Sequence, residues 1–148
     1  MFKIRLADMT DMERVFNLSN DDFVRENSVN KSKILWENHV QWFSERIKNT
    51  KEPFYVFEDK AGNFVAQVRF NKEDEEFVIS VSLEKDFRGK GLAANIIKIA
   101  SEKFGKYPIV AYIKKNNIPS AKSFAKAGYV PVGEKIINNE KYDKFVLN

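Results

Sequence analysis

The sequence predicts an α+β domain in which about four helices cover a mixed, mainly antiparallel seven-stranded sheet. Three observations predict this class. Short segments that alternate apolar and polar residues, as half-buried strands do, recur along the chain. Longer segments between them carry apolar residues at helical spacing. The 148 residues suffice for one domain, 1–148, with a core that needs neither disulfides nor a metal.

The first half of the chain is expected to supply three strands and two helices. Alternation predicts a strand over residues 2–6, and polar cap residues at 8–11 precede a short helix that includes Leu18. Residues 19–30 are expected to form a loop with some helical character around Phe23. An amphipathic helix is expected over residues 32–48. Strands at 53–59 and 64–71 then pair across the turn at 60–63.

The second half is expected to supply four strands and two helices. A strand over 76–83 leads into a glycine-containing loop, and an apolar helix over 92–104 ends at Gly105. A strand over 108–113 follows. The next helix begins at Ile118 or Pro119 and ends at Gly128, which matches the preference for proline at the start and glycine after the end. Strands over 129–137 and 141–147 form the final hairpin, and we find no internal repeat or linker.

Composition excludes several classes of protein. Cysteine is absent and His39 is the one histidine, so thiol nucleophiles, disulfide frameworks and multi-histidine metal sites are excluded. The net charge of +4 is mixed along the chain without a concentrated basic patch, so we expect no nucleic-acid partner. The first residues lack the apolar segment of a signal peptide, and no apolar run approaches membrane length. We therefore expect a cytoplasmic protein that does not bind membranes.

The segment Arg88-Gly89-Lys90-Gly91-Leu92-Ala93 predicts an anion site. Two glycines separated by one residue allow positive φ, which turns several N–H groups toward one point. The N-terminus of the helix that follows adds further free N–H groups and a partial positive charge. A phosphate fits such a site, although an ordinary strand-to-helix turn would also use the two glycines. The context of the loop has to decide between them.

Two motifs in the right order resemble those of the GNAT superfamily of acetyl-CoA-dependent N-acetyltransferases. The family pattern Gln/Arg-x-x-Gly-x-Gly/Ala is met by residues 88–93. A second pattern, Asn-x-x-Ser/Ala-x-x-x-Tyr-x-x-x-Gly-Phe, is matched by Asn117, Ser120, Gly128 and Tyr129, with Phe124 in the tyrosine position. The order of elements resembles the family over essentially the whole chain.

The resemblance implies acetyl-CoA as cosubstrate and no metal. Backbone groups near Leu83 would bind the pantetheine arm, the N–H groups of residues 88–93 would hold the pyrophosphate, and Asn117 would contact the pantetheine or its thiol end. The implied cofactor residues are Val81, Leu83, Arg88, Gly89, Lys90, Gly91, Leu92, Ala93, Asn117, Ser120 and Phe124. Lys122 or Lys126 would reach the adenosine phosphate unless they simply form a solvated face.

Phe124 departs from the family pattern at a position where the tyrosine commonly protonates the departing thiolate. Phenylalanine has no proton to donate, so water or another group must take over this task. Loss of one general acid typically slows a reaction about 10²-fold to 10⁴-fold without abolishing it. We therefore retain the prediction of an enzyme.

Three residues are candidates for the proton path, because an amine must lose a proton before it attacks the thioester. Glu76 is the first candidate for the base, and a solvated carboxylate that ends an acidic turn is the alternative role for it. Ser82, with Ser80, shares the predicted strand face of Glu76 and would hold a relay water. His39 has an ordinary pKa near neutrality but lies in a helix where it is equally suited to apolar packing.

Short similarities indicate the acceptor. The segment Trp36-x-x-His39-x-x-Trp42-Phe43 resembles one found in GNAT members that acetylate amino groups of nucleotide-linked sugars, and Ala111-Tyr112-Ile113 is similar to the same group. Trp42 and Tyr112 are therefore the expected substrate contacts. We expect a small-molecule amine, best an amino sugar or nucleotide-linked amino sugar, to attack acetyl-CoA directly in a ternary complex.

Two other functions stay open at this stage. Phe124 is compatible with a non-catalytic acetyl-CoA-binding or regulatory module, and the acceptor is alternatively a protein, a peptide or another small-molecule amine. A nucleotide hydrolase is disfavoured because the sequence lacks the Gly-x-x-x-x-Gly-Lys-Ser/Thr phosphate loop. Both a monomer and a homodimer are compatible with the sequence.

Overall fold

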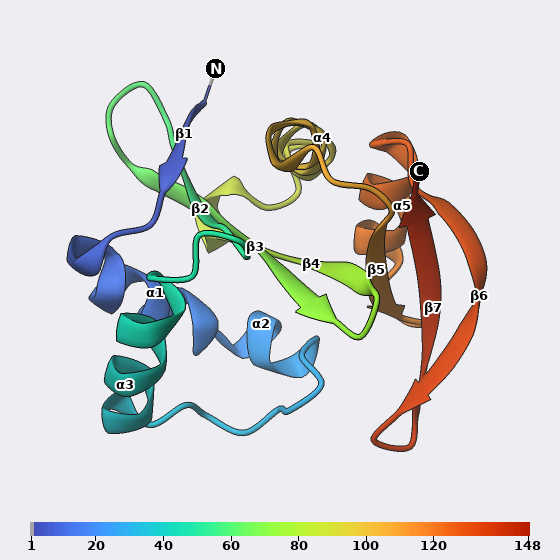
Figure 1. Cartoon of the computed structure of the whole chain (residues 1–148), viewed down its shortest axis with the longest axis horizontal. Helices are drawn as coiled ribbons and strands as arrows, with labels where there is room; N and C mark the ends of the chain where they lie inside the picture. Colours follow the sequence, from blue (N-terminus) through green and yellow to red (C-terminus); the bar gives the residue numbers. More distant parts are fainter. Residues whose placement is uncertain (1) are drawn as a thin grey trace.

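The computed structural model describes residues 2–148, and a seven-stranded sheet runs through it in the order β1-β2-β3-β4-β5-β7-β6 (Figure 1). Neighbouring strands are antiparallel except for the β4–β5 pair, which is parallel. The expected mixed, mainly antiparallel seven-stranded sheet is confirmed. The strands are β1 (Lys3–Leu6), β2 (Phe54–Glu58), β3 (Phe64–Glu73), β4 (Glu76–Leu83), β5 (Ile109–Lys114), β6 (Val130–Ile137) and β7 (Glu140–Leu147).

Five α-helices are present where about four were expected. They are α1 (Met12–Ser19), α2 (Asp22–Glu26), α3 (Trp36–Arg46), α4 (Ala93–Phe104) and α5 (Ile118–Lys126), and short 3-10 helices lie at Met9–Asp11 and Lys85–Phe87. None of the helices described is both long and apolar enough to cross a membrane.

The additional helix, α2, lies in the segment expected to be a loop with some helical character around Phe23. The Asp21 side chain caps it by accepting hydrogen bonds from the N–H groups of Phe23 and Val24. Helix α3 starts at Trp36 rather than at residue 32. The guanidinium of Arg25 holds the carbonyls of Asn30 and Ser32, which ties the segment before α3 to α2 and directs these carbonyls away from a helical ladder.

The two faces of the sheet differ in polarity. Helices α4 and α5 cover one face, where a continuous apolar core includes Phe57, Phe70 and Ile97 (Figure 1). Helices α1 and α3 cover β2 and its neighbours on the other face through a second cluster that includes Val15 and Phe43. Each such aromatic or aliphatic side chain stabilises the fold by about 1.5–3 kcal/mol. Beyond this second cluster, toward β4 and β5, the same face carries polar side chains.

Strands β4 and β5 diverge soon after they meet. Their described pairing joins Phe77 to Ile109 and Val78 to Val110, and stops there. The Glu84 N–H donates to the Val65 carbonyl of the adjacent segment at 2.8 Å. Because hydrogen-bonding sides alternate along an antiparallel pair, the backbone groups of Val81 and Leu83 face the diverging side. This divergence leaves backbone donors and acceptors beside the polar face.

Candidate active site

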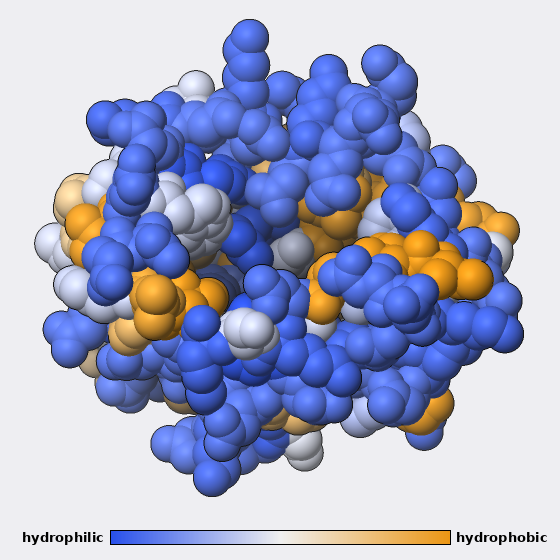
Figure 2. All heavy atoms as spheres, turned by 90° about the horizontal axis from the view of Figure 1, so that it is seen from below, coloured by the Kyte–Doolittle hydropathy of each residue, from blue (hydrophilic) through white to orange (hydrophobic). Residues whose placement is uncertain are grey.

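A cavity of about 1290 Å³ extends from the diverging ends of β4 and β5 to the glycine loop. Residues from α2, β3, β4, β5 and α5 line it, together with the turn between β6 and β7. Figure 2 shows the molecule hollowed near the centre of this face, with hydrophilic side chains and patches of hydrophobic ones around the hollow. The cavity therefore joins the predicted anion loop to the polar face of the sheet.

The loop at residues 88–93 has the backbone conformation that the sequence predicted. Gly89 and Gly91 both have φ of +72°. A Cβ at either position would meet nothing within 4 Å, so the left-handed backbone, rather than crowding, favours glycine here. Leu92 precedes α4 without a side-chain cap, which leaves the first-turn N–H groups for a ligand. The geometry fits a pyrophosphate. Lys90 is exposed and lies outside the cavity lining.

The side chain of Arg88 is directed to the protein rather than to the anion site. Its Nε donates to the Leu83 carbonyl at 3.0 Å, and another guanidinium nitrogen bonds Asp21 at 2.9 Å. The guanidinium carbon lies 4.8 Å from the centre of the Phe23 ring. Arg88 therefore fastens the loop to the end of β4 and to the start of α2. Because the Leu83 carbonyl already accepts this bond, Val81 offers the freer backbone groups for pantetheine.

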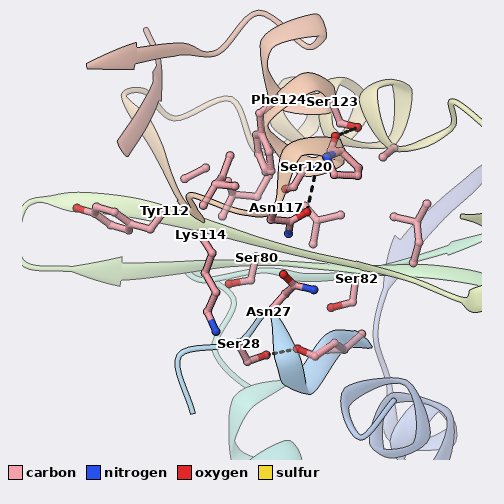
Figure 3. A pocket seen from close by; sticks show the side chains of 18 of the residues that line it. Asn27, Ser28, Ser80, Ser82, Tyr112, Lys114, Asn117, Ser120, Ser123 and Phe124 are labelled. Atoms are coloured by element: carbon pink, nitrogen blue, oxygen red, sulfur yellow. Dashed lines mark hydrogen bonds between the residues drawn. The ribbon is translucent and has the colours of Figure 1, made fainter. Parts of the chain in front are cut away.

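The second motif forms the wall of the cavity opposite the serines of β4 (Figure 3). Asn117 caps α5 by accepting a 3.3 Å hydrogen bond from the Ser120 N–H, so its Nδ2 stays available as a donor. Phe124 is buried and lines the cavity. Lys122 and Lys126 are exposed outside the lining.

Tyr129 does not replace the missing phenol of Phe124. The two rings pack edge to face with centroids 5.0 Å apart. The Tyr129 hydroxyl is hydrogen-bonded to the Ser101 hydroxyl at 2.8 Å in the core, and burial raises the pKa of Tyr129 to about 12. Tyr129 also lies outside the cavity lining. The structure thus places no tyrosine where the family pattern has its general acid.

Ser80 and Ser82 line the cavity, whereas Glu76 does not. Glu76 shares their strand face, as predicted, but lies at the far end of β4. One carboxylate oxygen pairs with the Lys144 ammonium at 2.5 Å, and the other accepts a 2.9 Å hydrogen bond from the Tyr112 hydroxyl. The bond from Lys144 and then that from Tyr112 lower the pKa of Glu76. Glu76 is therefore a structural anion with little basicity, and Tyr112 reaches the cavity beside it.

His39 lies in the core rather than in the cavity. It is buried on α3, its Nε2–H donates to the Met12 carbonyl at 2.8 Å, and its ring stacks on Phe43 with centroids 5.5 Å apart. Desolvation lowers its pKa, against the smaller opposite effect of the Met12 bond. The structure does not bring His39 to the other expected catalytic residues, because the helical spacing that suggested a site equally suits packing.

Trp42 also lies outside the cavity lining, but it touches a residue that the sequence analysis did not single out. The guanidinium of Arg69 lies 5.1 Å from the centre of the Trp42 ring. Arg69 and Gln67, both on β3, line the cavity opposite Ser80 and Ser82, their register partners on β4. The two-residue period of a strand places Gln67 with Arg69 on one face and Ser80 with Ser82 on one face. The β3–β4 register is needed to show that the two pairs share the same face.

Basic side chains outnumber acidic ones in the lining of the cavity, although two of them, Arg88 and Lys114, are paired with acids outside the lining. In the described chain, five basic residues line it, together with one carboxylate, that of Glu73. The basic residues are Arg25, Arg69, Arg88, Lys114 and Lys135. Lys114 is buried on β5; its Nζ donates to the Glu26 carbonyl at 2.7 Å, which joins the end of α2 to the sheet, and also pairs with the Glu140 carboxylate at 3.5 Å. Residues 2–148 contain no cluster of three or more His, Cys, Asp or Glu residues that could bind a metal ion.

Comparison of the sequence with protein families matches residues 2–130 to the family described as acetyltransferase (GNAT) domain. The chain belongs to this family. It is an N-acetyltransferase, and acetyl-CoA is its acetyl donor. No curated protein sequence matches the chain.

Solved structures of N-acetyltransferases share the fold over almost the whole chain. The spermidine N-acetyltransferase from Vibrio cholerae, in complex with CoA and spermine, has a TM-score of 0.84 and 17% identity, covering 98% of this chain and 92% of that one. The AAC(6')-Ib complex with ribostamycin and coenzyme A has a TM-score of 0.85 and 13% identity, covering 99% and 93%. A candidate phosphinothricin N-acetyltransferase has a TM-score of 0.77 and 25% identity, covering 99% and 96%.

Proposed function

We propose that this acetyltransferase acetylates the primary amine of a small molecule, specifically an amino sugar linked to a nucleotide. The charge of the cavity is the observation that carries this proposal. Five basic residues and one carboxylate line it in the described chain, and after the pairs of Arg88 with Asp21 and of Lys114 with Glu140 are set aside, Arg25, Arg69 and Lys135 still outnumber Glu73. A nucleotide diphosphate is an anion that such a lining attracts, whereas a polycation such as spermine is repelled by it. Among small-molecule amines, the lining therefore favours an anionic acceptor.

Different residues bind different parts of acetyl-CoA. The N–H groups of the loop at 88–93 and of the first turn of α4 hold the pyrophosphate. Backbone groups of Val81 and the Nδ2 of Asn117 bind the pantetheine arm on the two sides of the diverging strands. Acetyl-CoA supplies an activated acetyl thioester, and backbone N–H groups at the end of β4 polarise its carbonyl.

The proton path runs through water rather than through a strong base. Ser80 and Ser82 face the cavity, and their hydroxyls orient the water that takes the proton of the attacking amine. Because Phe124 has no proton to give, water also protonates the thiolate that leaves. The amine attacks the thioester directly, since the chain has no cysteine and no Ser–His–acid set to carry the acetyl group.

The same proposal takes residues 1–148 as one catalytic domain. It acts in the cytoplasm, as a monomer or a homodimer. A protein or peptide amine is the second candidate acceptor, because the cavity is open to solvent beside the exposed segment at 29–33.

A thiol-release assay with a panel of amines tests the proposed acceptor. The panel contains a nucleotide-linked amino sugar, the same amino sugar without its nucleotide, spermidine, an aminoglycoside and a short peptide. We expect kcat/KM for the nucleotide conjugate to exceed that for every other amine at least tenfold. Release of thiol with spermidine or the peptide but not with the conjugate would refute the proposal. Incubation with acetyl-CoA alone must leave no stable acetyl group on the protein.

A further inference from the structure

Arg69 is a basic residue in the cavity for which the protein supplies no counter-charge. It lies on β3 directly opposite Ser80 of β4 and lines the cavity. Within residues 2–148, no carboxylate oxygen lies within 4.0 Å of its guanidinium, and none of the hydrogen bonds described involves its side chain. Charged groups that are withdrawn from water are normally paired. An unpaired guanidinium that faces a cavity is therefore available to a ligand.

Aromatic rings, rather than an acid, hold Arg69 in place. Its guanidinium carbon lies 5.1 Å from the centre of the Trp42 ring and 5.9 Å from that of Phe54. Cation–π contacts hold a guanidinium against the face of an aromatic ring. Its N–H donors, which lie in the plane of the guanidinium, stay free to bind a ligand. Trp42, expected from the sequence to contact the substrate itself, thus supports the residue that faces the cavity.

The neighbours of Arg69 add positive charge instead of neutralising it. Arg25 donates to the carbonyls of Ser19 and Asn30, and Arg46 donates to that of Phe70, so both are engaged with neutral groups. Burial, with repulsion from Arg46 and then from Arg25, lowers the pKa of Arg69 to about 10. Arg69 is still protonated at neutral pH. The guanidinium groups of Arg25, Arg46 and Arg69 would therefore be stabilised by an anion bound beside them.

Gln67 supplies a complementary acceptor two residues earlier on the same strand face. Its Nε2 donates to the Ser19 hydroxyl at 3.1 Å, whereas its Oε1 is buried without a partner in the described chain. A buried acceptor without a hydrogen bond is destabilising, and an N–H donor from a ligand would supply the missing bond. Gln67 lies opposite Ser82, so this acceptor is beside the proposed proton path.

We propose that Arg69 binds an anionic group of the acceptor, a phosphate or a carboxylate, and thereby directs the acceptor amine toward Gln67, Ser80 and Ser82. The proposal deepens the proposed function and rests on it for the identity of the reaction. Directly opposed residues on paired strands have Cβ atoms about 4.5–5.5 Å apart. A single small acceptor can therefore contact Arg69 with its anion and the serines with its amine. The guanidinium fork suits the paired oxygens of either anion.

Steady-state kinetics of Arg69→Gln and Arg69→Lys test this assignment. For an anionic amine acceptor, we expect Arg69→Gln to lower kcat/KM about 50-fold and Arg69→Lys, which keeps the charge but loses the fork, about tenfold. The KM for acetyl-CoA, and the slow turnover of an amine that lacks an anionic group, should stay within twofold of the parent values. Lys72→Gln, on the same strand but outside the cavity, is the matched control. An equal loss of kcat/KM in Arg69→Gln for amines with and without an anionic group would overturn the proposal.

Tryptophan fluorescence gives a readout that does not depend on turnover. In a Trp36→Phe background, Trp42 is the one remaining tryptophan, and it contacts Arg69. The protein is first saturated with coenzyme A. It is then titrated with inorganic phosphate and, in a separate experiment, with acetate, and each titration is examined for a saturable change in Trp42 emission. A change with phosphate assigns a phosphate-bearing acceptor, and a change with acetate assigns a carboxylate. Arg69→Gln should abolish either change, and far-UV circular dichroism checks that this variant folds.

These experiments distinguish failure of the Arg69 anion site from failure of the proposed acceptor. Persistence of the fluorescence change in Arg69→Gln, or its absence with both anions in the parent, would overturn the anion site. An Arg69-dependent change without acetylation of nucleotide-linked amino sugars would instead support the anion site and overturn the proposed acceptor.

Discussion

The guanidinium of Arg88 in the glycine loop forms a 2.9 Å ion pair with Asp21, the residue that caps α2. This pair joins the predicted cofactor loop to the helix that borders the proposed acceptor side. Both side chains are largely withdrawn from solvent, so the pair is better placed to stabilise the fold than one on the open surface. The two halves of the cavity are therefore linked by one interaction between segments far apart in the sequence.

Asp21→Asn is expected to weaken this link while keeping the helix cap, because asparagine caps helices about as well as aspartate. We expect the KM for acetyl-CoA to rise about threefold to tenfold and the free energy of unfolding to fall by about 1 kcal/mol. The control is Asp22→Asn, which alters an adjacent and almost fully exposed carboxylate that pairs with Lys33. Identical kinetics for the two variants would show that the link has no role in cofactor binding.

Gly91→Ala should disturb cofactor binding more than stability. A non-glycine residue in the left-handed region costs about 1 kcal/mol, and relaxation of the backbone would turn the loop N–H groups away from the anion site. We expect the KM for acetyl-CoA to rise at least tenfold. Gly62→Ala provides the comparison, since Gly62 also has positive φ and open space around it but lies in a turn outside the cavity. Thermal unfolding should be similar in both, and a normal KM in Gly91→Ala would contradict the proposed loop function.

Phe124→Tyr should accelerate the chemical step by restoring a proton donor on the cavity wall. General acid catalysis typically contributes about 10²-fold or more, and we expect a gain of about tenfold to 10²-fold in the single-turnover rate. Tyr129→Phe is the control, because it removes a hydroxyl that bonds Ser101 away from the cavity and should lower stability without changing this rate. No acceleration in Phe124→Tyr would mean that protonation of the thiolate does not limit the reaction.

His39 should affect the pH dependence of stability rather than that of activity. Burial lowers its pKa in the folded chain, so the unfolded chain binds a proton first as the pH falls below about 6.5. Stability from this group is thus complete above that pH and declines as the pH falls toward the folded pKa. We expect His39→Gln to remove this decline in urea titrations between pH 7 and 5, and to cost about 1–3 kcal/mol at pH 7 through lost packing.

The kinetic side of the His39 prediction separates packing from catalysis. Because the ring lies in the core, the pH profile of kcat/KM in His39→Gln should follow that of the parent. A profile that loses an ionisation near neutrality would show that His39 takes part in proton transfer.

The loop at 88–93 and the cap at Asn117 could be predicted from the sequence alone. Positive φ at Gly91 and the hydrogen bond that the Asn117 side chain accepts from the Ser120 N–H depend on residues within a few positions of one another, so local sequence determines them. The same holds for the shared face of Ser80 and Ser82, which follows from the period of a strand. Element order then predicted the sheet. The short helix α2 was expected only as some helical character around Phe23, because contacts from distant residues, such as Lys114 to the Glu26 carbonyl, add to the local cap at Asp21.

The set of charged side chains that lines the cavity was decided only by the tertiary structure. Arg25, Arg69 and Lys114 belong to α2, β3 and β5, and only the sheet order and the docking of α2 bring them together. His39 and Trp42 show the converse, since their helical spacing is the same whether a helix faces a core or a site. Short-range sterics and hydrogen bonds determined the backbone of the glycine loop, whereas long-range packing decided which strands diverge and which charges remain unpaired.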